Sequence, residues 1–244
     1  MQVMQYNGEH SVVFGDKNTW DDWKLIPTSR PSFNPPPLRV ATIDVPGMNG
    51  TYDITDVLTG YPLYDNRTGS IEFMVVQDDK TWIERYSEVM NYLHGQKMKA
   101  YLTDEQYFKY EGRFTVSSWQ SSEHNSTIII DYDVYPFKLE PNSSIEDWLW
   151  DPFSFRDGVI RNYKSLTVDT SLTVRIPGTK DFTSPEFTVD TVGNTGMDVV
   201  FNGSTYHLPE GTSVNPNIVI KDQETNLVFN GSGTVSINMR GGKL

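Results

Sequence analysis

Short runs of strand-forming residues, separated by turn residues, recur at regular spacing between residues 165 and 239. Many short strands with little helix between them are typical of a β-sandwich. Asn202-Gly203 predicts a two-residue hairpin, and Gly231-Ser232-Gly233, which no helix follows, is interpreted as a hairpin turn. The predicted strands are residues 165–168, 172–176, 185–189, 198–201, 204–208, 218–221, 226–229 and 234–239.

Within the first 140 residues, one stretch has apolar residues at helical spacing, unlike the strand-like runs around it. Its apolar residues recur every three or four positions, which predicts a helix over about residues 79–94. Asp78 or Asp79 is placed to cap its start, and Gly95 to end it. The stripe, interpreted as a core face, consists of Trp82, Ile83, Tyr86, Val89, Met90 and Leu93. Strands are predicted at residues 3–6 and 11–14, as a hairpin around Asn7-Gly8, and at 98–102, 107–110, 113–119 and 127–134, the last with Ile130, Tyr132 and Val134 on one face.

The amino-acid composition of the sequence changes near residue 140. Pro141-Asn142-Ser143-Ser144 has a linker composition. We therefore expect two domains, residues 1–140 with the helix and residues 141–244 as the sandwich. With aromatic residues at 13%, 18 Gly and 14 Pro, the composition favours a mainly β fold.

Five prolines lie within residues 27–37, at Pro27, Pro31, Pro35, Pro36 and Pro37. Proline donates no backbone hydrogen bond, so this stretch is predicted to be an extended loop or arm. Two interpretations are open: a surface connection, or an arm that contacts a neighbouring subunit. For the second, the candidate contact residues are Pro31, Phe33, Pro35, Pro36 and Pro37. Exposed strand edges are further candidate contacts.

The net charge of −12 and the pI of about 4.7 argue against specific nucleic-acid binding, because an acidic surface repels phosphate. The same charge suits a wall past which DNA slides without sticking. With no cysteine, disulfides, thiol catalysis and cysteine-based metal sites are excluded. Neither a signal peptide nor an apolar run of about 20 residues is visible, so we expect a protein that does not enter a membrane.

No catalytic, cofactor or metal site is predicted. The histidines (His10, His94, His124 and His207) do not have metal-ligand spacing, and His94 is better placed to interact with a helix dipole. Asp131 and Asp133 share one strand face, where a pair of carboxylates usually faces solvent. Gly-x-Ser-x-Gly, phosphate-loop and calcium-loop motifs are absent.

Four stretches, in this order along the chain, resemble the distal tail proteins of siphophages. They are residues 43–55 (IDVPGMNGTYDIT), residues 93–95 through 110–114 (LHG to YEGRF), residues 130–138 (IDYDVYPFK) and residues 231–244 (GSGTVSINMRGGKL). Each is short, and their order over almost the whole chain makes the resemblance specific.

The resemblance implies an architecture: an N-terminal β-barrel-like domain that closes a homohexameric ring around a channel, and a C-terminal galectin-like β-sandwich. It also implies a structural virion protein, made in the bacterial cytoplasm and placed at the tail tip or baseplate. Its partners would be other copies of itself, the tail tube protein, the tail-tip hub or tail-associated lysin, and in some phages a receptor-binding protein. No membrane insertion and no enzyme activity are expected.

Two alternatives stay open. A carbohydrate-binding sandwich that recognises the host surface would use Trp148, Trp150 or Tyr206 as stacking platforms. The sugar-binding pattern of true galectins, His-x-Asn-x-Arg followed by Trp-Gly-x-Glu, is not found, and the cluster around Trp148 and Trp150 more often tucks a linker against its domain. The other alternative is a glycosidase that uses two of the 32 acidic residues.

Overall fold

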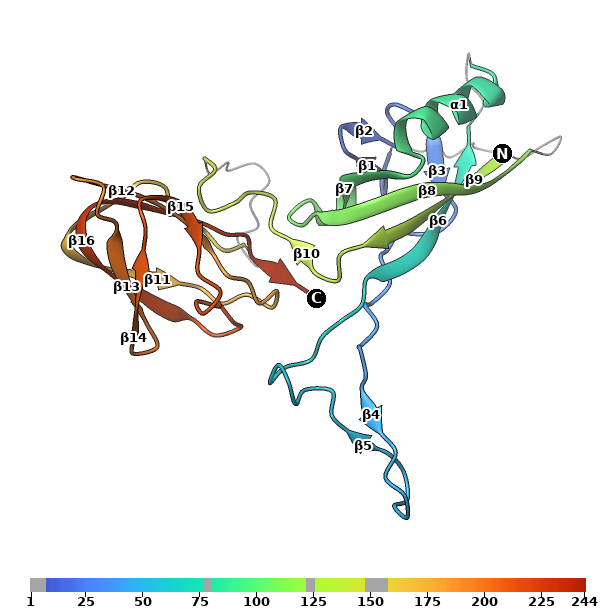
Figure 1. Cartoon of the computed structure of the whole chain (residues 1–244). Coiled ribbons are helices and arrows are strands. Elements are labelled where there is room, and N and C mark those ends of the chain that lie inside the picture. The colour runs from blue at the N-terminus through green and yellow to red at the C-terminus, as the bar shows by residue number, and fades with distance from the viewer. Residues whose placement is uncertain (1–7, 77–79, 122–125, 148–157) are drawn as a thin grey trace. The chain divides into compact units, whose positions relative to one another are not determined.

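The computed structural model describes residues 8–76, 80–121, 126–147 and 158–244. The chain divides into two compact units, unit 1 (Met1–Lys138 with Leu244) and unit 2 (Leu139–Lys243). Strands dominate both units, and the described residues contain one α-helix, α1 (Trp82–Leu93), which confirms the predicted β-rich class (Figure 1). The described part of the chain contains no helix with the length and hydropathy of a membrane span.

Unit 1 is built on a seven-stranded antiparallel sheet with the order β2-β1-β7-β8-β9-β6-β3. The pairs of residues that face each other across β8 and β9 alternate between the core and the solvent, so Ile130, Tyr132 and Val134 point inward as predicted. The strands are β1 (Val12–Phe14), β2 (Lys17–Asn18), β3 (Leu25–Pro27), β6 (Arg67–Val75), β7 (Gln96–Leu102), β8 (Tyr110–Ser121) and β9 (Ser126–Val134), with a short 3-10 helix, η1 (Thr103–Glu105), between β7 and β8.

The first described strand is β1, and the residues predicted to pair with it cannot be compared with the structure. β1 pairs with β2 on one edge and with β7 on the other, while residues 3–6 lie outside the described residues. Gly15, with a φ of 62°, makes the turn between β1 and β2. Among the described residues, the first hairpin is therefore formed by residues 12–18.

Helix α1 begins later and buries a narrower face than predicted. Its N-cap is Thr81, whose hydroxyl accepts a hydrogen bond from the backbone N–H of Glu84. The carboxylate of Glu84 in turn accepts from the backbone N–H of Thr81, which completes a capping box. The predicted caps, Asp78 and Asp79, lie outside the described residues. Val89 and Leu93 are buried, but Ile83 is 63% exposed, so its assignment to the core was wrong. Gly95, with a φ of 73°, follows the helix as predicted.

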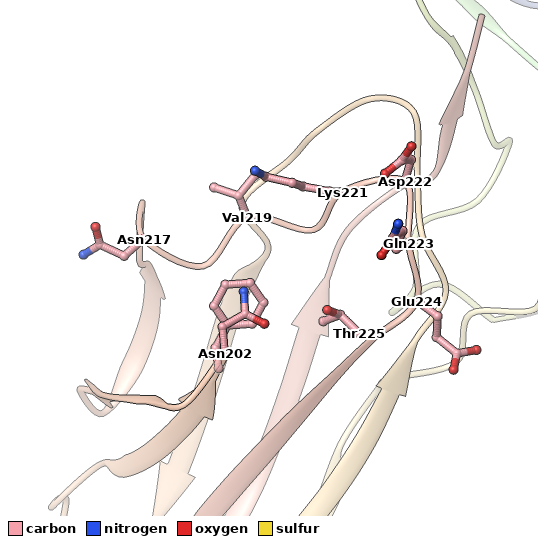
Figure 2. Close-up of a pocket in the computed structure, with 9 residues that line it drawn as sticks. Asn202, Asn217, Val219, Lys221, Asp222, Gln223, Glu224 and Thr225 are labelled. Carbon is pink, nitrogen blue, oxygen red and sulfur yellow. The ribbon is translucent and has the colours of Figure 1, made fainter. Parts of the chain in front are cut away.

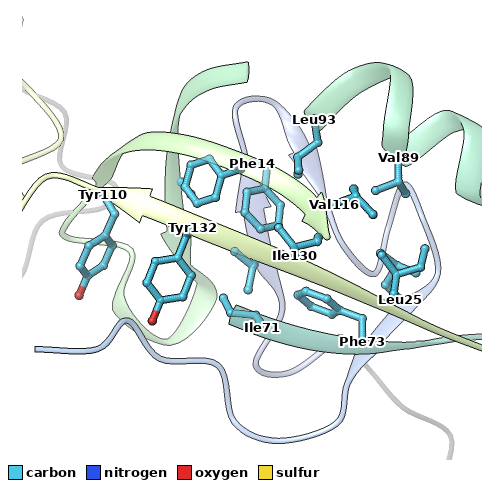
Figure 3. Packing of buried hydrophobic residues seen from close by; sticks show 14 of the residues in the cluster. Phe14, Leu25, Ile71, Phe73, Val89, Leu93, Tyr110, Val116, Ile130 and Tyr132 are labelled. Carbon is cyan, nitrogen blue, oxygen red and sulfur yellow. The ribbon is translucent and has the colours of Figure 1, made fainter. Parts of the chain in front are cut away.

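The core of unit 1 lies between the sheet and α1. Figure 3 shows Val89 and Leu93 of the helix directed toward side chains from β1, β6, β8 and β9. Phe14 packs edge-on against Phe114, with ring centroids 5.0 Å apart. Both rings are fully buried, and each contributes about 1.5–3 kcal/mol through its burial.

Unit 2 is organised by one long strand, β16 (Thr225–Asn238). On one side β16 pairs with β11 (Leu166–Ile176), and on the other first with β13 (Met197–Phe201) and then with β12 (Glu186–Thr191). The remaining strands are β14 (Ser204–Leu208), β15 (Gly211–Val214), and the pair β10 (Lys138–Leu139) with β17 (Gly242–Lys243). The core includes Phe187 and Phe229, whose ring centroids are 6.1 Å apart.

Three predicted features of unit 2 differ from the structure. The strands at 226–229 and 234–239 are one continuous strand, so Gly231-Ser232-Gly233 is not a hairpin turn. These glycines instead permit close packing, because a Cβ added at Gly231 would lie 2.9 Å from the Cβ of Met197. Likewise, the strands at 165–168 and 172–176 are one strand, β11. Residues 218–221 form only an isolated bridge, between Ile220 and Thr183.

Other predictions in unit 2 are confirmed or refined. Asn202 and Gly203 link β13 to β14 with positive φ at both positions, as a two-residue I′ turn requires. Within the stretch of linker composition, Ser144 is fully buried. Its hydroxyl accepts from the backbone N–H of Met239 at 2.9 Å, so this stretch is packed against the end of β16.

Candidate interaction surface

Residues 38–65, here called the arm, leave the sheet of unit 1 between β3 and β6 and project away from it (Figure 1). The arm contains the two-stranded ladder of β4 (Thr42–Ile43) and β5 (Tyr52–Asp53). None of its 28 residues is buried. It is therefore an extension of unit 1 that contributes nothing to the core.

The arm is held in shape by bonds between its outgoing and returning halves. Leu38 forms an isolated bridge with Tyr64, and Arg39 donates from its backbone to Leu63 at 2.8 Å. The Arg39 guanidinium also pairs with Asp65, with 2.6 Å between Nη2 and Oδ1. Because these bonds join only parts of the arm, they fix its path without attaching it to the sheet.

Farther out, the bonds remain internal. The backbone N–H of Ile54 donates to Ala41 O at 2.9 Å, and Ala41 donates to the hydroxyl of Thr55 at 3.1 Å. Hydrogen bonds from Thr55 hold the pKa of Asp53 below its ordinary value. Gly47 and Gly50, both with positive φ, shape the turn at the tip.

Large apolar side chains are exposed along the whole arm. Leu58 is 97% exposed and Val57 is 70% exposed. Exposed apolar side chains concentrated on one segment in this way make it a candidate interaction site. Four Asp and one Arg give the arm a net charge of −3. The nine large apolar residues exposed along it are Leu38, Val40, Ile43, Val45, Met48, Tyr52, Val57, Leu58 and Leu63.

The root of the arm is packed into unit 1. Phe33 stacks on Tyr110 with ring centroids 4.0 Å apart and meets Tyr132 edge-on at 4.8 Å. The backbone N–H of Asn34 donates to the Tyr132 hydroxyl at 2.8 Å. Burial is the main cause of a raised pKa at Tyr110, so this phenol stays protonated. The chain thus enters the arm from a rigid base.

Arg67 closes the root on the returning side. This side chain is 5% exposed, and it donates from Nε to Pro136 O at 2.7 Å and from Nη1 to Asn34 O at 3.0 Å. Burial lowers the pKa of Arg67, but a guanidinium remains charged in a protein. The guanidinium lies 5.7 Å from the centre of the Tyr110 ring, so one cation connects both ends of the arm.

The predicted contact residues lie at this root. Pro31 and Phe33 are buried within unit 1, Pro36 is half-buried, and Pro35 and Pro37 are exposed. Sequence reasoning stopped at Pro37 and missed the arm that follows. A signal was present in Val57-Leu58, where two apolar residues lie between turn residues and outside any strand or helix period.

The titratable residues do not form a chemical site. His10 pairs with Asp104 at 2.6 Å, and His207 pairs with Asp198 at 2.9 Å. Asp133 is exposed and accepts from Asn66. Within the described ranges, no group of three or more His, Cys, Asp or Glu side chains is arranged to hold a metal ion. His94 is exposed at the end of α1, and His124 lies outside the described residues.

Unit 2 carries a polar hollow of about 700 Å³ (Figure 2). It is lined by Phe201, Asn202, Asn217, Val219 and residues 221–225. Asn217, Val219 and Lys221 alternate with Ile218 and Ile220, which are fully buried, so these three side chains point away from the core.

Of the predicted stacking platforms, the structure describes Tyr206, which is not among the residues that line the hollow. Trp148 and Trp150 lie outside the described residues, and Tyr206 is half-buried against the core of unit 2. The carboxylates on the wall of the hollow are engaged already. Asp222 pairs with Lys180 at 3.2 Å, and Glu224 pairs with Arg175 at 2.5 Å.

Comparison with known proteins gives a result for the fold. No family model and no curated protein matches this sequence. Among solved structures, the chain is similar to one described as the SPP1 Dit (gp 19.1) protein, a paradigm of hub adsorption apparatus in Gram-positive infecting phages. The TM-score is 0.63 with 12% sequence identity, over 96% of this chain and 99% of the other. The chain therefore shares its fold, along nearly its whole length, with a phage hub protein.

Proposed function

We propose that this protein is a structural subunit of a bacteriophage tail tip that assembles with copies of itself through the arm. The observation that carries the proposal is an arm of exposed apolar side chains on a fold shared with a phage hub protein. The assembly is a homohexameric ring that joins the tail tube to the tail-tip hub, tail-associated lysin or baseplate. Its N-terminal unit forms the ring and its C-terminal unit is a galectin-like lobe.

The size of the arm is sufficient for this role. Association costs about 4–15 kcal/mol in lost freedom. Full burial of one large apolar side chain returns about 1.5–3 kcal/mol. Two or three buried side chains would return at most about 9 kcal/mol, which is less than the upper part of that cost. Full burial of the nine on the arm would return about 14–27 kcal/mol, which matches or exceeds it. A heterologous contact repeated by a fixed rotation then closes a ring.

The further partners follow from this position in the virion. The tail tube protein would bind one face of the ring and the tail-tip hub or lysin the other, with a receptor-binding protein at the periphery in some phages. The net charge of −12 fits a ring through which DNA passes without specific binding. The role requires mechanical fit and no catalysis.

The decisive experiment measures mass in solution. Sedimentation velocity, alone and with the tail tube protein, should show a hexamer for the wild type, and negative-stain images should show six-fold rings. The double variant Val57→Asp/Leu58→Asp should be monomeric. The matched control is Val192→Asp in unit 2, where Val192 is 90% exposed but lies far from the arm in sequence. Monomers for the wild type under every condition would refute the proposal.

A second candidate function is carbohydrate recognition by unit 2, and the polar hollow is the observation that favours it. Its volume of about 700 Å³ lies within the usual range for ligand sites, about 300–1,000 Å³. Asn202, Asn217 and Gln223 offer neutral amides, which donate and accept at once as sugar hydroxyls require. Calorimetric titration with host cell-wall oligosaccharides tests it. Asn217→Ala and Gln223→Ala should lose binding, and Asn226→Ala, on the neighbouring strand, should keep it.

A further inference from the structure

Three aromatic side chains meet at the surface of unit 1, where α1 begins. This aromatic cluster consists of Trp82, Tyr86 and Trp119. The ring centroid of Trp119 lies 4.3 Å from that of Trp82 and 4.8 Å from that of Tyr86. Trp119 is 45% exposed, and its neighbour on the helix surface, Ile83, is 63% exposed. The cluster is therefore open to solvent on one side.

A β-bulge directs Trp119 to this position. The β8–β9 register passes from Val116 opposite Ile130 to Ser118 opposite Ile129, so one residue of β8 is extra. Trp119 consequently lies opposite Ile128, which is fully buried, and shares its face of the sheet with α1. In a regular ladder with no bulge, Trp119 would instead lie opposite Thr127 and its indole would point to the other face, because side chains alternate along a strand. The fold thus places a large aromatic residue where only half of it is covered.

Exposed tryptophan at a site built in this way is characteristic of an interface. Trp and Tyr are enriched among the residues that carry most of the binding energy in protein contacts. A ring of identical subunits also needs two different complementary surfaces on each subunit. The arm provides one of them, and its receiving surface must lie elsewhere on the same chain.

The cluster and the arm lie at opposite ends of one strand pair. The arm joins β6 at Arg67, which pairs with Val134, whereas the cluster lies beside Phe73 and Ile128. Phe73 lies six positions after Arg67 on β6, which is about 20 Å at ~3.3 Å per residue. Figure 1 shows the arm running away from the side of the sheet that carries α1. Surfaces so placed suit a head-to-tail contact between copies.

A second aromatic group lies at the same end of the strand pair as the arm, and not at the opposite end. Tyr135 and Tyr64 pack on either side of Phe137, with both ring centroids 5.9 Å from that of Phe137. Because Tyr64 belongs to the arm, this group lies at the arm's own root. Tyr135 is 41% exposed, close to the value for Trp119, and it serves as a matched control.

We propose that the aromatic cluster of Trp82, Tyr86 and Trp119, with Ile83 beside it, is the surface that receives the arm of a neighbouring copy. This inference rests on the proposed self-assembly and names its second half. Val57 and Leu58, the most exposed apolar side chains of the arm, pack against the indole of Trp119 in the neighbour.

Complementation between two defective chains tests the pairing. Trp119→Ala and Val57→Asp/Leu58→Asp should each be monomeric alone. Mixed in equal amounts, they should form a 1:1 dimer and no larger species, because only one intact arm and one intact cluster remain. Ile83→Asp, which changes an exposed helix residue and spares the core, should weaken assembly at least tenfold. Tyr135→Ala should assemble like the wild type.

Cross-linking gives an independent measurement, since the chain has no cysteine of its own. Leu58→Cys chains mixed with Ile83→Cys chains should form a disulfide-linked heterodimer on mild oxidation, and Val192→Cys in place of Ile83→Cys should not. Normal assembly by both Trp119→Ala and Ile83→Asp, while the arm variant is monomeric, would place the receiving surface elsewhere and leave the proposed function intact. A monomeric wild type would instead remove the proposed function itself.

Discussion

The sheet and helix of unit 1 and the arm that projects from them use similar residues in opposite ways. Leu25, in the sheet, is fully buried, whereas Leu58, in the arm, is 97% exposed. The apolar side chains of the sheet and helix stabilise the fold, and those of the arm remain free for another molecule. The comparison teaches that stability resides in the sheet and helix, and that the proposed assembly would use a separate part of the same unit.

The strongest way to break this comparison is to truncate a leucine in each region and measure denaturant unfolding at a concentration where the chain is monomeric. Leu25→Ala should lower the free energy of unfolding by about 2–5 kcal/mol, because it opens a cavity. Leu58→Ala should change it by less than about 0.5 kcal/mol. A comparable loss in both variants would show that the arm is part of the cooperative fold.

The next largest change in the free energy of unfolding is expected for Arg67, at the root of the arm. Arg67→Met keeps much of the volume but leaves the carbonyls of Pro136 and Asn34 without their donor, which should cost about 1–3 kcal/mol. Proteases should then cleave the arm faster, since its base is loosened. The arm counterpart is Arg39→Met, which removes an exposed ion pair and should leave the unfolding midpoint unchanged. If proteases cleaved the arm equally fast in Arg67→Met and in the wild type, Arg67 would not be what holds the root of the arm.

A smaller loss of stability is expected when the N-cap of α1 is removed, and a matching threonine in the arm provides the comparison. Thr81→Ala removes the hydroxyl of the capping box and should destabilise the protein by about 0.5–2 kcal/mol, seen as a lower thermal midpoint. Thr55→Ala removes a hydroxyl that serves only the arm ladder, so its midpoint should match the wild type. Equal thermal midpoints for the two variants would contradict the prediction.

The smallest effect is a dependence on pH. Burial alone would raise the pKa of Asp22, but hydrogen bonds from Lys17 and from the backbone of Asn18 outweigh it and hold the pKa below 3.8. A carboxyl with a depressed folded pKa stabilises the fold above its unfolded value and loses that contribution as the pH falls. Asp22→Asn should therefore cost a few tenths to about 1 kcal/mol at pH 7, with a difference that shrinks below pH 3.8.

Asp53 provides the arm counterpart for the pH experiment. Hydrogen bonds from Thr55 lower the pKa of Asp53 as well, yet this residue is exposed and touches only the arm. Asp53→Asn should alter the pH profile of unfolding less than Asp22→Asn does, because solvent screens the interactions of an exposed carboxyl. A profile altered as much as that of Asp22→Asn would show coupling between the arm and the core.

Local patterns predicted the elements whose determinants are close together in the chain. The alternation in β9 showed which residues face inward, and Asn202-Gly203 specified its own turn. The start of α1 was missed although its signal was local: Thr81 and Glu84 have capping-box spacing, but the two aspartates just before them offered a competing cap.

Features that depend on distant partners could not be predicted. Gly231 and Gly233 are compatible with a turn or with a strand that other chain segments approach closely, and only the packing of Met197 and the pairing with β11 decide between them. The exposure of Leu58 is of the same kind. The irregular pair Val57-Leu58 marks a segment outside strand or helix, but a leucine has the same sequence signal in a core and on a surface, so its exposure is visible only in the tertiary structure.

Attachment through its root alone gives the arm an unusual freedom in evolution. In the proposed ring, substitutions along residues 38–65 would alter what the subunit fits at little cost to the stability of the fold, since none of these side chains is buried. Two lineages can accordingly drift until their subunits no longer mix, each keeping an intact domain. In a cell that makes both, the arms would sort the copies by ancestry.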